Sequence, residues 1–339
     1  MCNERVGGTA RAQLGRLYRS RRRHGRSEGT AILAAAVVGL CGTALSRSAR
    51  AQACCTATGN SDVGVVQPGV QAALAVQASW EHAAFSYAAD GRQRALRNAS
   101  ADDWVLSFGG GVRLFEPLAL HAAAPMRLQR RRLGDETAQN ALRPGDSLVG
   151  ARYLVLHDPL PAHGAARFSQ LEIASFAKLP TGRDATESET SSGVDATGDG
   201  VLQLGLGVDA AVRLPRVHWL DAGVGFALRL PKEVSGRKLD PGDEITLRAG
   251  YAWVPDVFLA LGGGVSYRGT LATKEEGTDI PASETRRIRA TVFARHTLRH
   301  PIWHLMTSLS SDLPMDGFGK NVPYAGSTLS ISVQRSWVK

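Results

Sequence analysis

The stretch 202–214, LQLGLGVDAAVRL, alternates apolar residues with mostly polar or small ones along its whole length. Its even positions carry only Leu, Val and Ala, whereas its odd positions carry Gln, Gly, Asp, Ala and Arg. Successive side chains of a β-strand point to opposite faces, so this stretch predicts a strand with one apolar and one polar face. Its 13 residues exceed the roughly five or six of a typical soluble strand and suit a tilted strand that crosses a bilayer.

The same rhythm recurs along the chain from residue 70 to its end. It is equally clear in 219–230, 244–254 and 257–268, and helical periodicity is scarce throughout this region. Twelve segments are predicted as strands: 70–79, 103–115, 117–130, 147–156, 168–179, 201–214, 219–230, 244–254, 257–268, 286–297, 302–311 and 325–337. The expected fold class is therefore all-β, a transmembrane antiparallel up-and-down barrel of about twelve strands within 70–339.

The connections between these segments alternate between long and short, as an even-stranded barrel with both ends on the periplasmic side requires, and only the link 157–167 is of intermediate length. The long connections are 80–102, 131–146, 180–200, 231–243, 269–285 and 312–324.

Tryptophan and tyrosine favour membrane interfaces. An aromatic girdle is therefore expected from residues at strand ends: Trp104, Trp219, Trp253, Tyr267, Trp303, Tyr324 and Trp337. The last segment alternates and ends near an aromatic residue, which is similar to the signal read by the outer-membrane assembly machinery.

The first 53 residues differ in composition from the rest of the chain. Ten arginines and two glutamates give 1–53 a charge of +8, so its removal would lower the formal net charge from +9 to +1. The basic stretch precedes an apolar run at 30–45 and the small residues AQA at 51–53, which is the order of a cleavable signal peptide. The run is shorter than the roughly 20 apolar residues of a membrane-spanning helix. An uncleaved anchor and a lipidated Cys54 are the alternatives.

We therefore expect 1–53 to be a signal peptide and 54–69 to be an N-terminal periplasmic tail. Because the basic charge belongs to the leader, no nucleic-acid partner is expected. After cleavage only the adjacent Cys54 and Cys55 would remain, which excludes a disulfide framework.

Charged residues on the polar faces of the predicted strands are expected to face the barrel interior, because near the midplane a charge facing lipid costs roughly 2–4 kcal/mol. Twelve strands enclose a narrow lumen, so two interpretations of the arginine surplus stay open. The charges could fill the lumen as ion pairs, or they could line a cationic pore that favours anionic solutes. The expected pore-lining charges are Arg113, Arg127, Arg152, Lys178, Arg213, Arg229, Arg248, Arg268, Arg287, Arg289, Arg295, Glu172, Asp209 and Asp221.

Three short patterns suggest chemistry but lack its context. Residues 145–148 spell GDSL, the nucleophile motif of an esterase family, yet no apolar strand precedes the serine and no Asp-x-x-His follows. The glycine triplets 109–111 and 262–264 lack the lysine and helix of a phosphate-binding loop and are typical of a bend or a close backbone approach. The histidine ladder from 296 to 304 would need a helix, but its segments alternate as strands. We expect no catalytic residue, no metal and no cofactor.

Two motifs in the middle of the chain resemble a known family. The sequence GDSLVGARY at 145–153 is similar to the Gly-Asp-x-x-x-Gly-x-Lys-Tyr strand start of the MetA-pathway phenol-degradation family of outer-membrane β-barrel proteins. The sequence KLPTG at 178–182 is similar to a strand end of that family, and DGVLQLGL at 199–206 falls where the family resumes with an acidic loop and a new strand. The resemblance implies passage of aromatic or other small hydrophobic compounds and supplies no catalytic residue. Its closest matches are Gly145, Asp146, Lys178, Leu179, Pro180, Thr181 and Gly182.

Together these patterns predict an outer-membrane channel or transporter for small aromatic or anionic compounds, and not an enzyme. The expected partners are outer-membrane lipids, the assembly machinery through the last strand, and a small solute of unknown identity. A closed barrel that acts as a scaffold or binds other molecules through its loops is the alternative. A barrel-embedded hydrolase is the third option, and it would need Ser147 or an aspartate paired with a histidine at one rim.

Overall fold

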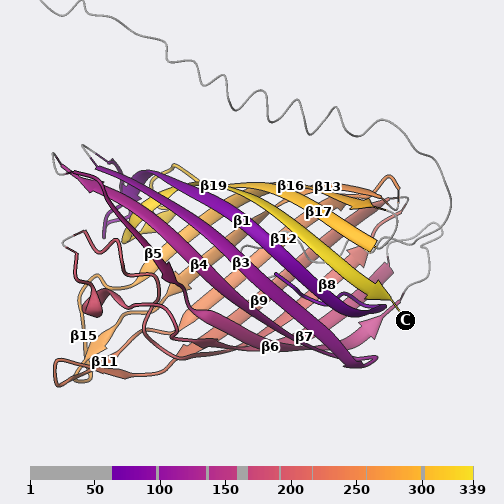
Figure 1. Cartoon of the computed structure of the whole chain (residues 1–339), viewed down its shortest axis with the longest axis horizontal. Coiled ribbons are helices and arrows are strands. Elements are labelled where there is room, and N and C mark those ends of the chain that lie inside the picture. The colour runs from indigo at the N-terminus through magenta and orange to yellow at the C-terminus, as the bar shows by residue number, and fades with distance from the viewer. Residues whose placement is uncertain are drawn as a thin grey trace, which may run out of the picture. The chain divides into compact units, whose positions relative to one another are not determined.

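The computed structural model describes residues 63–96, 99–134, 137–158, 167–190, 192–215, 217–256, 258–298 and 302–338. The expected signal peptide 1–53 and the two cysteines that follow it lie outside these residues. Twelve long strands dominate the described part (Figure 1): β1 (Val70–Tyr87), β3 (Ala99–Phe115), β4 (Leu118–Leu133), β6 (Ser147–His157), β7 (Arg167–Leu179), β8 (Gln203–Arg213), β9 (His218–Arg229), β12 (Glu244–Trp253), β13 (Leu259–Thr270), β16 (Thr285–Leu298), β17 (Ile302–Asp312) and β19 (Val322–Val338).

The twelve long strands form one closed antiparallel barrel. They pair in chain order, and the ring closes where β1 pairs with β19, with Val76 opposite Val333. β13 likewise pairs with both β12 and β16. Each long strand of the described part therefore has a neighbour on both sides. The backbone N–H and C=O groups can then form hydrogen bonds between strands, which lipid could not provide. The predicted fold class is confirmed, including the number of strands.

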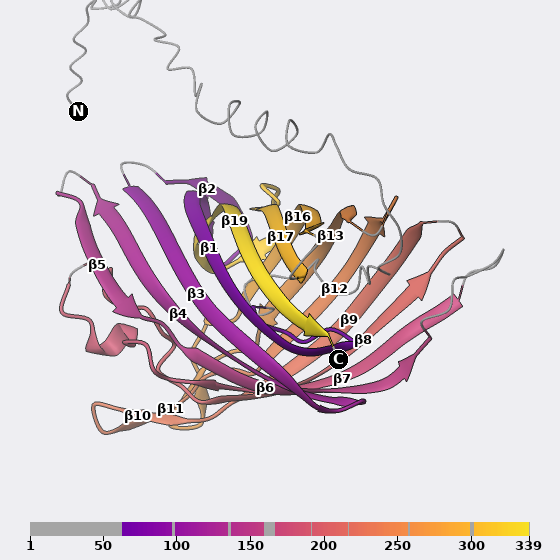
Figure 2. The same cartoon turned by 45° about the vertical axis from the view of Figure 1, so that its right-hand side comes forward.

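The two ends of the barrel differ in their connections. Short connections lie at the end where β1 begins and β19 finishes, which we call the turn end. Longer connections lie at the opposite loop end, where β10, β11, β14 and β15 form a small separate sheet (Figures 1 and 2). The short elements are β2 (Gln93–Ala95), β5 (Gln139–Pro144), η2 (Ala185–Glu187), β10 (Lys232–Val234), β11 (Arg237–Asp240), β14 (Lys274–Glu275), β15 (Thr278–Asp279) and β18 (Gly319–Lys320).

Four strands extend three or more residues further toward the loop end than the sequence predicts. β1 continues to Tyr87 beyond the expected 79, β3 begins at Ala99, β4 continues to Leu133 beyond 130, and β19 begins at Val322. The added residues are paired, as where Glu81 lies opposite Asp103. Charged residues interrupt the apolar alternation in the extensions of β1, β3 and β4, and Pro323 interrupts it in that of β19, which is why periodicity alone ended the strands too early.

The outer surface of the barrel wall is apolar and its inner face is polar. On β8, Leu204, Leu206 and Val208 are exposed on the outside, whereas Gln203 and Asp209 are buried. No helix in the described part is long and apolar enough to span a membrane. Exposed leucine and valine of this kind also line β1, β9, β12 and β19, so the outer wall forms an apolar band that suits lipid.

Candidate functional site in the barrel interior

The most extensive ion-pair network of the interior lies toward the loop end and is centred on Asp312, which is fully buried. Its carboxylate accepts hydrogen bonds from Arg287 Nε at 2.5 Å, from Arg287 Nη2 at 2.7 Å and from the Gly326 backbone N–H at 2.7 Å. Arg287 and Arg289 on β16 also reach Glu81 on β1, at 2.5 and 3.1 Å. Because β17 and β19 lie between these two strands, the network connects four strands across the inner face.

A second network joins the inner faces of β6, β7, β8 and β12. Arg152 Nη1 lies 3.3 Å from Glu172 and 3.7 Å from Asp209, and Arg248 forms an ion pair with the same Asp209. Asp221, on the neighbouring β9, is half-buried on the same face. The fold thus brings together interior charges that are up to about a hundred residues apart in the sequence.

The remaining ion pairs of the interior lie nearer the rim. Arg268 Nη2 lies 2.6 Å from Glu244, and Arg127 pairs with Asp103. At least eight of the eleven predicted interior cations have a carboxylate partner: Arg127, Arg152, Lys178, Arg229, Arg248, Arg268, Arg287 and Arg289. The interior is therefore far closer to electrical neutrality than the sequence suggested.

Sequence reasoning missed most of these carboxylates. Glu81 and Asp312 lie just beyond the predicted ends of their strands, and Asp103 and Glu244 are the first residues of theirs. Continuing the alternation by two residues along β1 and by one along β17 would have assigned Glu81 and Asp312 to the interior. Each faces an arginine predicted to line the pore, and the missing signal was the pairing of distant strands.

A segment before β1 also occupies the interior. Val63 and Val66 are almost fully buried, and a Cβ built on Gly109 would overlap the backbone of Val63. A Cβ on Gly64 would in turn overlap the backbone of β3. The glycine triplet 109–111 is therefore a close backbone approach, one of the two roles that its sequence indicated.

Two arginines hold the same segment 63–69 in place. Arg113 donates from Nη2 to the Gln67 carbonyl at 2.9 Å and from Nε to the Val70 carbonyl at 3.1 Å. Arg295, which comes from β16, donates to Gln67 Oε1 at 3.1 Å. The sequence indicated a periplasmic tail for 54–69. The described part of that tail, 63–69, packs inside the barrel, because Gly64 and Gly109 have no side chain that would keep the two backbones apart.

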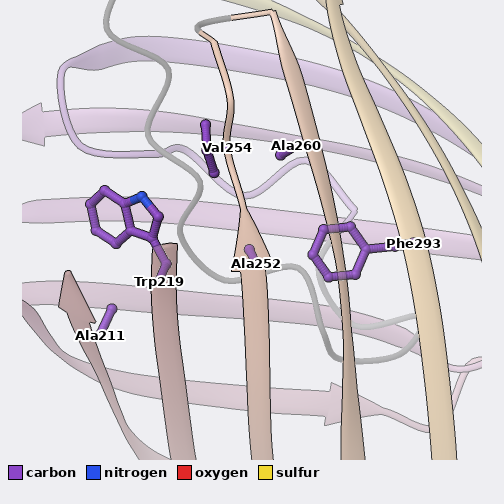
Figure 3. Packing of buried hydrophobic residues seen from close by; sticks show 6 residues of the cluster. All are labelled: Ala211, Trp219, Ala252, Val254, Ala260 and Phe293. Atoms are coloured by element: carbon purple, nitrogen blue, oxygen red, sulfur yellow. The ribbon is translucent and has the colours of Figure 1, made fainter. Parts of the chain in front are cut away.

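An apolar cluster lies on the inner side of the wall nearer the turn end. It comprises Ala211, Trp219, Ala252, Val254, Ala260 and Phe293, with Ala252 between the two aromatic rings (Figure 3). The Arg213 guanidinium lies over the Trp219 ring, 5.3 Å from its centroid. Trp219 therefore does not belong to the lipid-facing girdle that the sequence predicted. The alternation that exposes Leu220 outside the barrel places its neighbour Trp219 inside.

Tyr324 also departs from the predicted girdle. The Arg131 guanidinium lies 5.0 Å from the centroid of its ring, and the same Arg131 donates to the backbone carbonyls of Ser192 and Gly193 in the loop 180–202. Tyr324 thus packs against an arginine that binds this loop, on the inner side of the wall.

The other predicted girdle residues lie on outward-facing strand positions. Trp104 and Trp253 are 37% and 39% exposed, and Tyr267 lies opposite the exposed Leu247. Trp303 and Trp337 flank Arg335 on the outside at the turn end. The sequence reasoning missed Trp80, which is 40% exposed and lies opposite Trp104.

The family-like motif residues meet at the loop end, where β6 begins and β7 finishes. The Asp146 carboxylate is nearly buried and accepts hydrogen bonds from the backbone N–H groups of Gly182 at 3.0 Å and Asp199 at 2.8 Å. Lys178 Nζ lies 3.3 Å from Asp146 and 2.5 Å from the Asp199 carboxylate. The two motifs are thus two halves of one anchor for the loop 180–202.

Thr181, from the motif 178–182, also binds the motif 145–153. Its Oγ1 accepts from the Ser147 N–H at 2.8 Å and donates to the Gly145 carbonyl at 2.7 Å. Leu179 is the last residue of β7 and lies opposite Ser147. Pro180 follows, and because proline has no N–H to continue a ladder, the strand ends there. The motif residues therefore position a loop.

The loop 180–202 is held by a second carboxylate of its own. Asp195 accepts hydrogen bonds from Arg183 Nη1 at 2.8 Å, from Thr190 Oγ1 at 2.8 Å and from the Glu189 N–H at 3.0 Å. Burial favours the neutral acid, but the bonds from Ser188, Glu189 and Thr190 outweigh it and hold the pKa of Asp195 well below its usual range. The loop is therefore a folded unit at the loop end.

The patterns that suggested chemistry are structural where they are described. The Ser147 hydroxyl lies 3.0 Å from Thr181 Oγ1 within the loop anchor. His296 and His304 lie on the paired strands β16 and β17. Among the described residues, no group of three or more His, Cys, Asp or Glu side chains could hold a metal ion.

Comparison with known proteins identifies the fold. No family model and no curated protein matches the chain. A COG4313 outer membrane channel from Pseudomonas putida F1 is similar in structure, with a TM-score of 0.62 and 14% identity over 83% of this chain and 100% of that one. The translocator domain of the Neisseria meningitidis autotransporter NalP gives a TM-score of 0.41 and 11% identity over 79% and 88% of the two chains. The β domain of the Bordetella autotransporter BrkA gives 0.45 and 9% over 79% and 100%.

The protein is thus a closed twelve-stranded β-barrel of the outer-membrane type. At 14% identity, the likeness to the COG4313 outer membrane channel extends to the fold and leaves the solute to be argued from this chain's own residues.

Proposed function

We propose that this chain forms a narrow channel for small solutes in the outer membrane of a Gram-negative bacterium. The observation that carries the proposal is that interior charges are paired and yet touch solvent. The side chains of Arg287, Arg289 and Glu81 are 26%, 22% and 29% exposed although all three point into the barrel. A wetted, charged lumen inside an apolar wall is the arrangement of a diffusion channel.

The proposed solute is a small aromatic or anionic compound. The similarity of 145–153 and 178–182 to the phenol-degradation family supports an aromatic one. The Arg213 guanidinium lies over the buried Trp219 ring and so places a positive charge beside the apolar cluster of the interior. This pairing supports passage of compounds that carry both an aromatic ring and an acidic group.

The proposal includes the route to the membrane and the partners there. Export would use the signal peptide 1–53, and assembly would use the alternating last strand β19, which ends near Trp337. Outer-membrane lipids would cover the exposed apolar wall. No chemical step is proposed, because Ser147 and the carboxylates described above form hydrogen bonds and ion pairs within the protein.

Planar-bilayer recording tests the channel directly. The purified full-length barrel, checked for folding by its faster migration on a detergent gel before heating, should produce small, discrete conductance steps. A folded barrel that inserts and gives no steps at any voltage would overturn the proposal.

One observation favours a second candidate, a closed barrel. The segment 63–69 lies in the lumen and is bonded to Arg113 and Arg295, which come from different parts of the wall. Under this candidate the interior charges act as a plug. Replacing Arg287, Arg289 and Arg295 by alanine should then leave the barrel folded and open a conductance absent from the wild type, with Arg92→Ala in the exposed loop as control.

A further inference from the structure

Arg335 is a charged residue on the lipid-facing side of the barrel wall. On β19 the outward positions Ile331 and Val333 are exposed apolar residues, and Arg335 continues the same face. In register it lies between the exposed Leu74 on β1 and Trp303 on β17. A lipid-facing arginine destabilises the barrel unless its guanidinium lies at the membrane–water interface or has a partner of opposite charge.

The guanidinium of Arg335 is held in place by two tryptophans. Its carbon lies 5.6 Å from the Trp303 ring centroid and 4.9 Å from the Trp337 ring centroid. Both distances are within the range of a cation–π interaction. The charge is therefore fixed at the turn end, among the aromatic residues expected to mark the membrane interface.

The same guanidinium has unused hydrogen-bonding capacity. Its Nε is shielded from solvent and has no hydrogen-bond partner, and no carboxylate of the described part forms an ion pair with Arg335. Apart from Arg213, the interior arginines described above are instead bonded to carboxylates, carbonyls or side-chain oxygens. Arg335 thus holds a fixed positive charge, without a carboxylate partner among the described residues, on the lipid-facing side of the wall.

We propose that Arg335, Trp303 and Trp337 bind the phosphate of a phospholipid in the leaflet at the turn end. A guanidinium presents planar, paired donors that match phosphate oxygens and stacks on aromatic faces at the same time. The exposed Leu74 and Val333 beside it would contact the acyl chains. This inference rests on the membrane placement proposed above and adds a lipid site that the channel function does not require.

Native mass spectrometry of the detergent-solubilised full chain, titrated with phosphatidylglycerol, tests the site. Arg335→Gln should weaken retention of the most tightly bound lipid about tenfold, which is about 1.4 kcal/mol of binding free energy, because it removes the charge and the planar donors that would meet the phosphate. Arg335→Lys should weaken it less, because a lysine keeps the charge and loses the planar donors. Arg92→Gln is the control, because Arg92 is a highly exposed arginine at the opposite, loop end, and its lipid retention should equal that of the wild type.

The outcomes separate this site from the channel itself. Equal lipid retention by wild type and a folded Arg335→Gln barrel would overturn the inference, and so would inorganic phosphate that displaces the lipid at equal concentration. If Arg335→Gln does not fold, wild-type retention by Arg335→Lys overturns it in the same way. If the barrel conducts but lipid retention does not depend on Arg335, the channel proposal stands and the lipid site is overturned. If lipid retention depends on Arg335 but the barrel does not conduct, the lipid site stands and the channel proposal is overturned.

Discussion

At the scale of single residues, the carboxylates of the loop end decide how the loop 180–202 is held. Asp146 accepts two backbone N–H groups from different parts of this loop, and Lys178 bridges Asp146 and Asp199. A nearly buried carboxylate with three partners is costly to disturb, because each lost partner leaves a polar group unsatisfied. The motif residues Asp146 and Lys178 therefore have a structural role in this chain, which is to hold the loop 180–202.

Asp199 makes the loop anchor sensitive to acid. Burial raises the pKa of this loop carboxyl, but Lys178 and then Arg229 and Arg268 outweigh it and lower the pKa to about 2. The folded pKa lies below the unfolded value of about 3.9, so the contribution to stability is complete above about pH 4 and is lost as the pH falls toward 2.

Hydrogen exchange of the loop 180–202, corrected for the intrinsic rate, should therefore show protection at pH 5 and deprotection approaching pH 2. Asp199→Asn removes the titrating group and should show weaker protection at pH 5 with little further loss on acidification. Equal pH dependence in both proteins would refute the role of Asp199.

At the scale of elements, the closing region of the barrel depends on Asp312. Its carboxylate is fully buried and bonded to Arg287 and to the Gly326 backbone, which ties β16, β17 and β19 together. Asp312→Ala removes one partner of a buried pair, so the free energy of unfolding should fall by about 3–5 kcal/mol. Urea unfolding followed by gel mobility measures this change.

Asp316→Ala is the control for Asp312→Ala. Asp316 is exposed and accepts one bond, from the Gln93 N–H at 2.8 Å, so its loss should change stability by less than about 1 kcal/mol. Similar losses in the two variants would show that Asp312 has no special place in the closing region.

The packing of the segment 63–69 against β3 gives a second prediction at this scale. Gly109→Ala introduces a Cβ that overlaps the backbone of Val63, so the segment must leave its place and the conductance in planar bilayers should rise. Gly110→Ala is the matched control, because its Cβ would meet mainly the flexible end of Leu74 on the outside. A folded Gly109→Ala barrel with wild-type conductance would show that the segment does not limit the pore.

At the scale of the whole molecule, the balance of interior charge decides which ions pass. Most of the interior cations have carboxylate partners, so the wild-type channel should be only weakly selective for anions. Glu81→Gln leaves Arg287 and Arg289 without one of their partners. The reversal potential in a KCl gradient should then shift toward the chloride equilibrium potential. Glu233→Gln, on the exposed β10 outside the barrel wall, should leave it unchanged, and an equal shift in both would point to surface charge.

The sequence by itself determined the twelve strands, their order, and which side of each strand faces out. This was possible because lipid and lumen act on each residue locally, so a two-residue period survives in the sequence without knowledge of any partner. The stretch 202–214 is an example: its apolar positions are the ones exposed on β8.

Only the tertiary structure decided what occupies the interior. Glu81 meets Arg287 across 206 positions of sequence, and Trp219 turns inward although its position at a strand end suggested the interface. The segment 63–69 enters the lumen because two glycine-bearing backbones can approach closely. These ion pairs and the packing of the lumen depend on closure of the barrel, because closure brings together strands that are distant in the sequence. Contacts between distant strands produce no periodic pattern in the sequence.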